Sequence, residues 1–211
     1  MTDTVFRGWP EEFQRFFIGL ELDNSKRYFE AHRDVYQTAV RAPMEALVGS
    51  LEPLFGPGKV FRINRDIRFS ADKSPYKTNI AATVGMGGVG GYISLDARGL
   101  SVATGRYEMA PATMPRYREA VDRERSGSEL AAIVDGLEAD GYQVGGEELK
   151  RVPPGYPKEH PRARLLRHKR LYAWKAFGLQ PWLGSAAAKD HVLDTWSRAE
   201  PLNEWFRINL D

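Results

Sequence analysis

The chain has 211 residues, no cysteine and nearly balanced charges, with 30 Lys and Arg against 28 Asp and Glu. This length is enough for a hydrophobic core, and the lack of cysteine excludes disulfides, thiolate catalysis and cysteine-ligated metals. The small net charge of +2 gives no overall field that would favour nucleic acid or anionic lipid.

The sequence carries no sign of export or of membrane insertion. Its N-terminus lacks the basic start and the apolar run of a signal peptide. The longest uncharged stretch, residues 78–95, is rich in glycine, threonine and serine and would span a membrane poorly. We therefore predict a cytoplasmic protein without a membrane segment, folded as one domain over residues 1–211.

The first part of the chain carries helical patterns. After Pro10, apolar residues recur at the three- and four-residue spacing of an amphipathic helix, at Phe13, Phe16, Phe17 and Leu20. A break at residues 23–24 separates this helix from a second one, for which Asn24 is the predicted N-cap. Pro43 kinks or restarts the second helix, and glycine and proline at residues 56–58 end the helical part.

Residues 61–69, FRINRDIRF, predict a strand because apolar and polar residues alternate in them. The core face would carry Phe61, Ile63, Ile67 and Phe69, and the other face Arg62, Asn64, Asp66 and Arg68. Arg65 breaks the alternation, and a buried guanidinium needs a carboxylate or several other acceptors. Glu108 is one candidate partner, and a β-bulge that turns Arg65 outward is the alternative.

A loop over residues 70–77 follows this strand, and it is longer than most hairpin loops. Arginine and lysine side chains gathered at one strand end could hold a phosphate or a carboxylate, because guanidinium groups match those anions. A tyrosine there would add a directional hydrogen bond, and Asp66 would orient an arginine. The predicted ligand-binding residues are Arg62, Arg65, Asp66, Arg68, Lys73, Tyr76 and Lys77. The alternative for the same residues is a network of structural salt bridges on a solvated strand face.

More strand patterns follow from Thr78 onwards. Residues 85–90 match the dinucleotide fingerprint G-x-G-x-x-G, but a strand pattern follows where that motif requires a helix. We therefore interpret this stretch as a glycine loop. Residues 96–99 predict a hairpin turn, and the whole region predicts an antiparallel meander of about four strands.

Helical patterns return near Pro115 and again at the C-terminus. Between them we expect short strands over residues 142–144 and 149–152, a proline-rich irregular loop, a short basic helix over residues 162–170 and a strand over residues 171–177. The predicted fold class is therefore α+β, with a central antiparallel sheet of about four or more strands and N-terminal and C-terminal helices packed on it.

Residues 62–79, RINRDIRFSADKSPYKTN, resemble a long motif of an uncharacterised, mainly bacterial family, domain of unknown function 2461. Similar stretches occur at residues 13–36 (FQRFFIGLELDNSKRYFEAHRDVY), 105–107, 149–161 (LKRVPPGYPKEHP) and 165–177. The resemblance covers nearly the whole chain. It implies membership of this family but no activity, cofactor or partner.

Nucleic-acid binding by residues 162–177 is the second candidate function. Basic side chains neutralise phosphates, and aromatic rings stack on unpaired bases. The basic members are Arg162, Arg164, Arg167, Lys169, Arg170 and Lys175, and the aromatic ones Tyr172, Trp174 and Phe177. The competing interpretation assigns the apolar side chains to the core and the arginines to its solvated rim. A scaffold for protein partners is a third alternative.

Neither a metal nor a cofactor is predicted, since the four histidines show no metal-ligand spacing and no clustered carboxylates. A small anionic ligand is the expected partner, nucleic acid is the less favoured one, and no membrane is expected. The sequence leaves open whether the protein is an enzyme and which oligomeric state it adopts.

Overall fold

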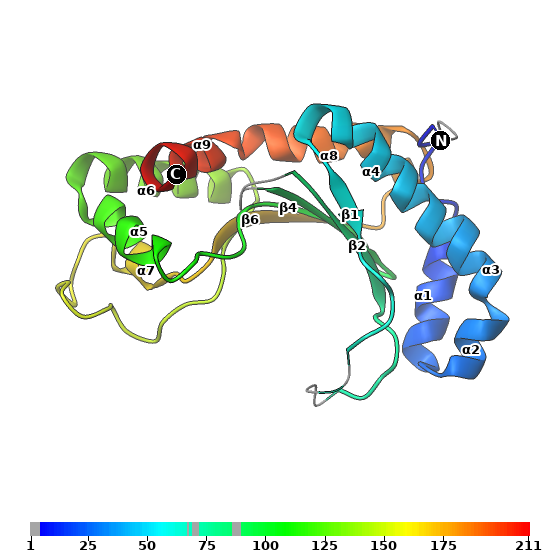
Figure 1. The fold of residues 1–211 in the computed structure, drawn as a ribbon. Coiled ribbons are helices and arrows are strands. Elements are labelled where there is room, and N and C mark those ends of the chain that lie inside the picture. The colour runs from blue at the N-terminus through cyan, green and yellow to red at the C-terminus, as the bar shows by residue number, and fades with distance from the viewer. Residues whose placement is uncertain (1–4, 67, 69–71, 86–89) are drawn as a thin grey trace. The chain divides into compact units, whose positions relative to one another are not determined.

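The computed structural model describes residues 5–66, 68, 72–85 and 90–211 (Figure 1). The chain forms two compact units. Unit 1 consists of Met1–Met86, Tyr92–Val102 and Ala176–Asp194, and unit 2 of Gly87–Gly91, Ala103–Lys175 and Thr195–Asp211. That the chain is one domain over residues 1–211 stays a prediction.

Within the described residues, six strands form one antiparallel sheet in the order β1-β2-β3-β4-β6-β5. The strands are β1 (Gly58–Val60), β2 (Asn79–Val84), β3 (Gly90–Asp96), β4 (Gly99–Arg106), β5 (Gln143–Gly145) and β6 (Leu171–Gly178). Helices precede, interrupt and follow them in the chain. The predicted α+β class is therefore confirmed. The strand after the glycine loop and the hairpin turn at residues 96–99 are confirmed as well. Gly99 in this turn has a φ of 118°, a conformation that favours glycine. Residues 86–89 of the glycine loop lie outside the described residues.

The N-terminal helices of unit 1 pack around an aromatic core. All four residues of the predicted apolar stripe on α1 are buried, and α1 contacts the helical segments that follow it. The last helix of this group, α4, packs on β1 and β2. The helical elements are α1 (Glu12–Leu22), α2 (Lys26–Ala31), α3 (Arg33–Val35), the π-helix η1 (Tyr36–Arg41) and α4 (Ala42–Phe55); η2 (Pro181–Gly184) and the start of α8 (Ala187–Arg198) follow in unit 1.

The cap of α2 differs from the prediction by one residue. Ser25 is the N-cap, and its hydroxyl accepts the Tyr28 N–H at 3.1 Å. The predicted cap, Asn24, instead pairs with the main chain of Tyr76, donating to its carbonyl at 3.1 Å and accepting its N–H at 3.0 Å. A carboxamide can donate and accept at once, as a peptide group does, so Asn24 serves as a one-residue strand partner.

The predicted strand over residues 61–69 is wrong in its described part. Regular pairing ends with β1 at Val60. Beyond it, Phe61 donates its N–H to the Ala81 carbonyl at 2.8 Å, and an isolated antiparallel bridge joins Asn64 to Tyr76. Local side-chain bonds compete with a ladder here: Asp66 accepts the Arg68 N–H at 3.3 Å, and Asp72 accepts the Ser74 N–H at 2.9 Å. Ile67 and Phe69 lie outside the described residues, as do Ser70 and Ala71.

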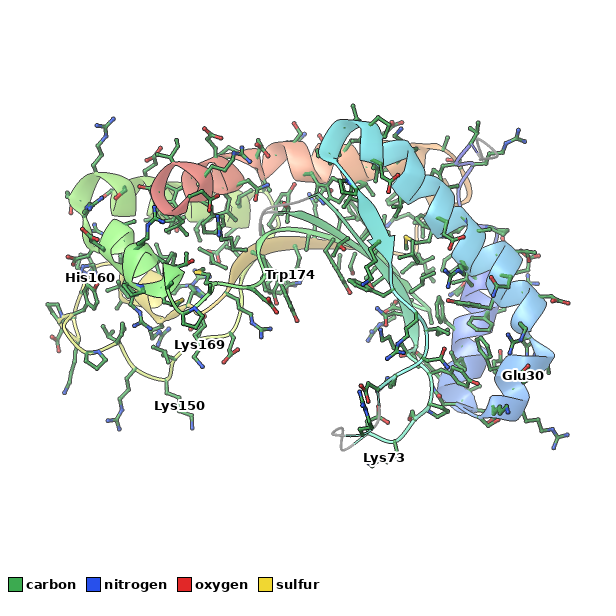
Figure 2. The ribbon with its side chains drawn as sticks, viewed as in Figure 1. Glu30, Lys73, Lys150, His160, Lys169 and Trp174 are labelled. Atoms are coloured by element: carbon green, nitrogen blue, oxygen red, sulfur yellow. The ribbon has the colours of Figure 1, made fainter. Side chains whose placement is uncertain are left out.

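Unit 2 has its own hydrophobic core. Helices α5 (Thr113–Asp122), α6 (Glu124–Ala139) and α9 (Glu200–Leu210) bury apolar side chains against Leu171 and Ala173 of β6. The predicted basic helix is shorter than expected, since α7 covers Ala163–Arg167. Trp174 follows Ala173 in β6, so strand alternation places it on the face opposite this core, and it is labelled in Figure 2.

Candidate functional site

The predicted ligand-binding residues lie on the loop between β1 and β2, where Figure 2 labels Lys73. Arg68 forks onto Asp66, with its Nε 2.9 Å from Oδ1 and its Nη2 2.6 Å from Oδ2. This contact lowers the pKa of Asp66. Arg65 pairs with Asp72 and donates from Nε to the Tyr76 carbonyl at 2.9 Å. Arg65 thus has a carboxylate partner as one of the two alternatives required, but this partner is Asp72 and not the candidate Glu108.

Lys77 and Tyr76 anchor the second half of this loop. The Lys77 ammonium donates to the Arg62 carbonyl at 3.1 Å, and burial together with the charges of Arg62 and Arg65 lowers its pKa. Tyr76 is buried and stacks on Phe29 of α2, with 4.3 Å between ring centroids. The loop is thus fixed to the helices of unit 1.

An open pocket of about 430 Å³ lies where α2, the π-helix η1 and the start of this loop meet. Four of its lining side chains are cationic and one is a carboxylate, an excess of three positive charges. The described residues that line it are Lys26, Phe29, Glu30, Arg33, Tyr36, Gln37, Arg41, Arg62, Ile63, Asn64 and Tyr76.

Two of these cations already have acidic neighbours. Arg33 forks onto Glu30, at 3.1 Å from Nε and 2.6 Å from Nη2, and this contact lowers the pKa of Glu30. Arg41 donates from Nε to Glu45 at 2.8 Å. In contrast, neither Lys26 nor Arg62 forms an ion pair with any residue that the structure describes. Pairs this exposed are weak, so they do not cancel the positive character of the pocket.

The pocket contains only part of the predicted set. Arg62 and Tyr76 line it, whereas Arg65, Asp66, Arg68, Lys73 and Lys77 are not among the described lining residues. Sequence reasoning missed Lys26, Arg33 and Arg41. Their recurrence at intervals of seven and eight residues along a helical stretch was the available signal, because such residues share one side of a helix.

In unit 2, the basic residues of the region 162–177 are engaged with protein groups. Arg162 is buried, and the others pair at the surface. The partners are Glu124 for Arg162, Glu138 for Arg164, Glu148 for Arg167, Glu147 for Lys169 and Arg170, and the Asp140 carbonyl for Lys175. These contacts give each cation a structural role. Surface pairs of this exposure are as weak as those of Arg33 and Arg41, and nucleic-acid binding by this region stays a prediction.

His168 is a fully buried histidine of unit 2 whose two ring nitrogens form no hydrogen bond with the described residues. Burial lowers its pKa, an effect that nearby Glu148 opposes and that Arg164 and Arg167 reinforce. Within the part of the chain that the structure describes, no group of three or more His, Asp or Glu side chains is placed to hold a metal ion.

We expect the stability of unit 2 to fall on acidification because of His168. Its pKa is lower in the folded than in the unfolded chain, so below about pH 6.5 the unfolded chain binds the extra proton. Stability should be constant just above that pH and fall by at most about 1.4 kcal/mol per pH unit below it. Urea unfolding at pH 7.5 and 5.5 measures this; an equal loss in His168→Gln would contradict it.

The fold defines the class of the protein, an α+β protein. The chain belongs to the family described as conserved hypothetical protein (DUF2461), whose model matches residues 12–205. This match confirms the resemblance found in the sequence. No curated protein and no solved structure matches the chain. No helix within the described residues combines the length and apolar character needed to cross a membrane.

Proposed function

We propose that unit 1 binds a small anionic ligand in the pocket between α2, η1 and residues 62–64. The observation that carries this proposal is the excess of positive charge on the pocket wall, contributed by side chains from two separate parts of the chain. Positive groups held in a concave surface attract and retain anions more strongly than the same groups scattered over a convex one.

The charged wall is built on ordered supports. Lys26, Arg33 and Arg41 project from helical elements, so their backbone positions are set by hydrogen bonding and by the aromatic core. Arg62 stands at the start of the loop, next to the bridge between Asn64 and Tyr76. A binding group on a rigid element loses little freedom when a ligand arrives, which favours affinity.

The remaining residues of the predicted set would act indirectly. The pairs Arg65–Asp72 and Arg68–Asp66 hold the loop in its course, and Arg65 also binds the main chain of Tyr76. We propose that they keep Tyr76 against Phe29 and so maintain one wall of the pocket. The Tyr76 hydroxyl would then offer the ligand a hydrogen bond, as the sequence predicts.

We propose that the pocket binds this anion, and we propose no turnover. We also propose that the protein works in the cytoplasm. The complete lack of cysteine supports this location, because proteins of reducing compartments do not use disulfides.

Replacing Arg62 with alanine should weaken anion binding about 10- to 100-fold, the cost of one lost charge-assisted contact. Titration calorimetry with inorganic phosphate, pyrophosphate and malate as probes measures the affinity. Arg98→Ala is the matched control, since it removes the same charge from an exposed turn of unit 1, where Arg98 pairs with Asp96. If the parent protein binds none of the three probes, or if both variants bind equally well, the proposal is wrong.

A further inference from the structure

The π-helix η1 changes which side chains the pocket wall receives. Ala42 donates its N–H to the Gln37 carbonyl, five residues back, where an α-helix would use the residue four back. Isolated π-helical turns within α-helices are rare and frequently occur at functional sites. Here the turn lies between α3 and α4, and Pro43, which has no N–H to donate, is the second residue after it.

The extra residue in this turn brings Arg41 to the pocket. In an uninterrupted α-helix, the residues three, four and seven places after Arg33 would share its face. That face would include Tyr36, Gln37 and Val40. In the structure Arg33, Tyr36, Gln37 and Arg41 line the pocket, whereas Val40 is fully buried. The π turn thus replaces an apolar side chain on the wall by a guanidinium.

Tyr36 brings a second unusual feature to the same wall. Its side chain is only 2% exposed, and its buried hydroxyl makes no hydrogen bond of normal geometry with the residues that the structure describes. A buried polar group without a partner costs free energy, so its presence requires an explanation. Burial raises the pKa of this phenol, and the adjacent Arg41 guanidinium opposes that rise by its charge and by a contact with the hydroxyl that falls outside normal hydrogen-bond geometry.

The charges of the wall indicate which kind of anion would fit. Even when Glu45, the partner of Arg41, is counted with the lining residues, two positive charges remain in excess. A phosphate monoester carries a charge of about −1.5 to −2 at neutral pH and three acceptor oxygens, whereas a carboxylate carries a single charge. Guanidinium groups also match the geometry of phosphate oxygens.

We infer that the ligand is a phosphorylated small molecule, an inference that rests on the proposed function. Its phosphoryl group binds at the π turn, where it accepts a hydrogen bond from the Tyr36 hydroxyl and pairs with Arg41. Arg41 uses one of its five N–H donors for Glu45, so others remain for a ligand oxygen. Arg62 and Lys26, which have no ion pair among the described residues, would neutralise the remaining charge.

Tyr36→Phe is the decisive variant, because it removes only the hydroxyl and keeps the ring in the core. Among the described residues this hydroxyl has no hydrogen bond of normal geometry and only the Arg41 guanidinium beside it, so the ligand-free variant should stay within about 1 kcal/mol of the parent protein. Its affinity for pyrophosphate, the probe used here, should fall about 10- to 100-fold. Arg41→Gln should show a loss of similar size, and Tyr92→Phe, on β3 and outside the described pocket lining, should bind as the parent does.

Calorimetry and thermal unfolding of the four proteins separate the outcomes. Pyrophosphate binding that weakens in Tyr36→Phe and in Arg41→Gln, with malate bound at least tenfold more weakly by the parent protein, supports the inference. Pyrophosphate binding unchanged in Tyr36→Phe, a ligand-free Tyr36→Phe that is clearly destabilised, or malate bound as tightly as pyrophosphate overturns it while leaving the anion site in place. A parent protein that binds neither probe overturns both the inference and the proposed function.

Discussion

Replacing Arg162 with alanine is expected to destabilise unit 2 by about 3–5 kcal/mol, because two main-chain carbonyls lose their donor, at about 1–3 kcal/mol each, and the packing of the buried side chain is lost as well. Arg162 is buried and donates from Nε to the Val121 carbonyl and from Nη2 to the Asp122 carbonyl, both at 2.8 Å. These carbonyls end α5, where the helix itself supplies no donor. The same guanidinium contacts Glu124 and Ser128 of α6, so its loss disconnects two helices.

Denaturant unfolding followed by amide hydrogen exchange measures this loss and assigns it to unit 2. Arg123→Ala is the matched control, since Arg123 is exposed and pairs only with Glu119 within the described residues. It should stay within about 0.5 kcal/mol of the parent protein. The stability of Arg162→Lys should lie between those of the two alanine variants, because an ammonium cannot bind all the acceptors that the planar guanidinium binds. Equal stability of Arg162→Ala and Arg123→Ala would show that Arg162 has no such role.

The second large effect is expected for Tyr76→Ala in unit 1, at about 3–5 kcal/mol. Tyr76 is 5% exposed and stacks on Phe29, so alanine would leave a cavity against the aromatic core. Its main chain is held by Asn24 and Arg65, and these contacts cannot fill that space. Thermal unfolding of the variant should therefore show a clear loss, and pyrophosphate affinity should fall with it because one wall of the pocket is gone.

Tyr76→Phe distinguishes packing from ligand contact. The ring and its stacking on Phe29 remain, so stability should stay within about 1 kcal/mol of the parent protein. If the hydroxyl binds the ligand as proposed, affinity for pyrophosphate should still fall severalfold. A Tyr76→Ala variant as stable as Tyr76→Phe would contradict the role assigned to the ring.

Several elements followed directly from local patterns. The stripe of α1, the alternation in β2 and the turn at residues 96–99 are properties of neighbouring residues, so the sequence alone predicts them. The same holds for the short strand β5 and for β6, where alternating residues face the core of unit 2. The strand predicted over residues 149–152 is wrong, since these residues form no strand. The same local patterns sufficed for the α+β class, since they predict helices before and after an antiparallel meander of strands.

The failures have a common cause in side chains that compete for backbone groups. Asn24 and Ser25 are both suitable N-cap residues. The neighbouring sequence does not indicate that the Asn24 side chain will bind the main chain of Tyr76, which lies 52 residues away. The alternating pattern of residues 61–69 predicts a strand, and residues 61–65 do bind main-chain groups of residues 75–81, but Asp66 and Asp72 bind N–H groups of their own segment, where a continued ladder would need them.

The candidate site shows the same division between local pattern and spatial arrangement. Charge counting drew attention to residues 62–77, and Arg62 and Tyr76 of that stretch do line the pocket. Arg65 and Arg68 instead pair with acids only a few residues away, and Lys77 binds a main-chain carbonyl. Proximity of opposite charges in the chain does not reveal which pairs will form. Lys26, Arg33 and Arg41 entered the pocket from the N-terminal helices, which no spacing rule could join to the loop.

Local residue order was thus enough for the identity of most helices and strands, because hydrogen bonding within a helix or turn depends on neighbours in the chain. The pocket, the use of Asn24 as a strand partner and the exchange of Val40 for Arg41 on the wall depended on contacts between distant segments. Such contacts are settled by which packing buries the most apolar surface while leaving the fewest polar groups unpaired, and that balance is a property of the folded chain as a whole.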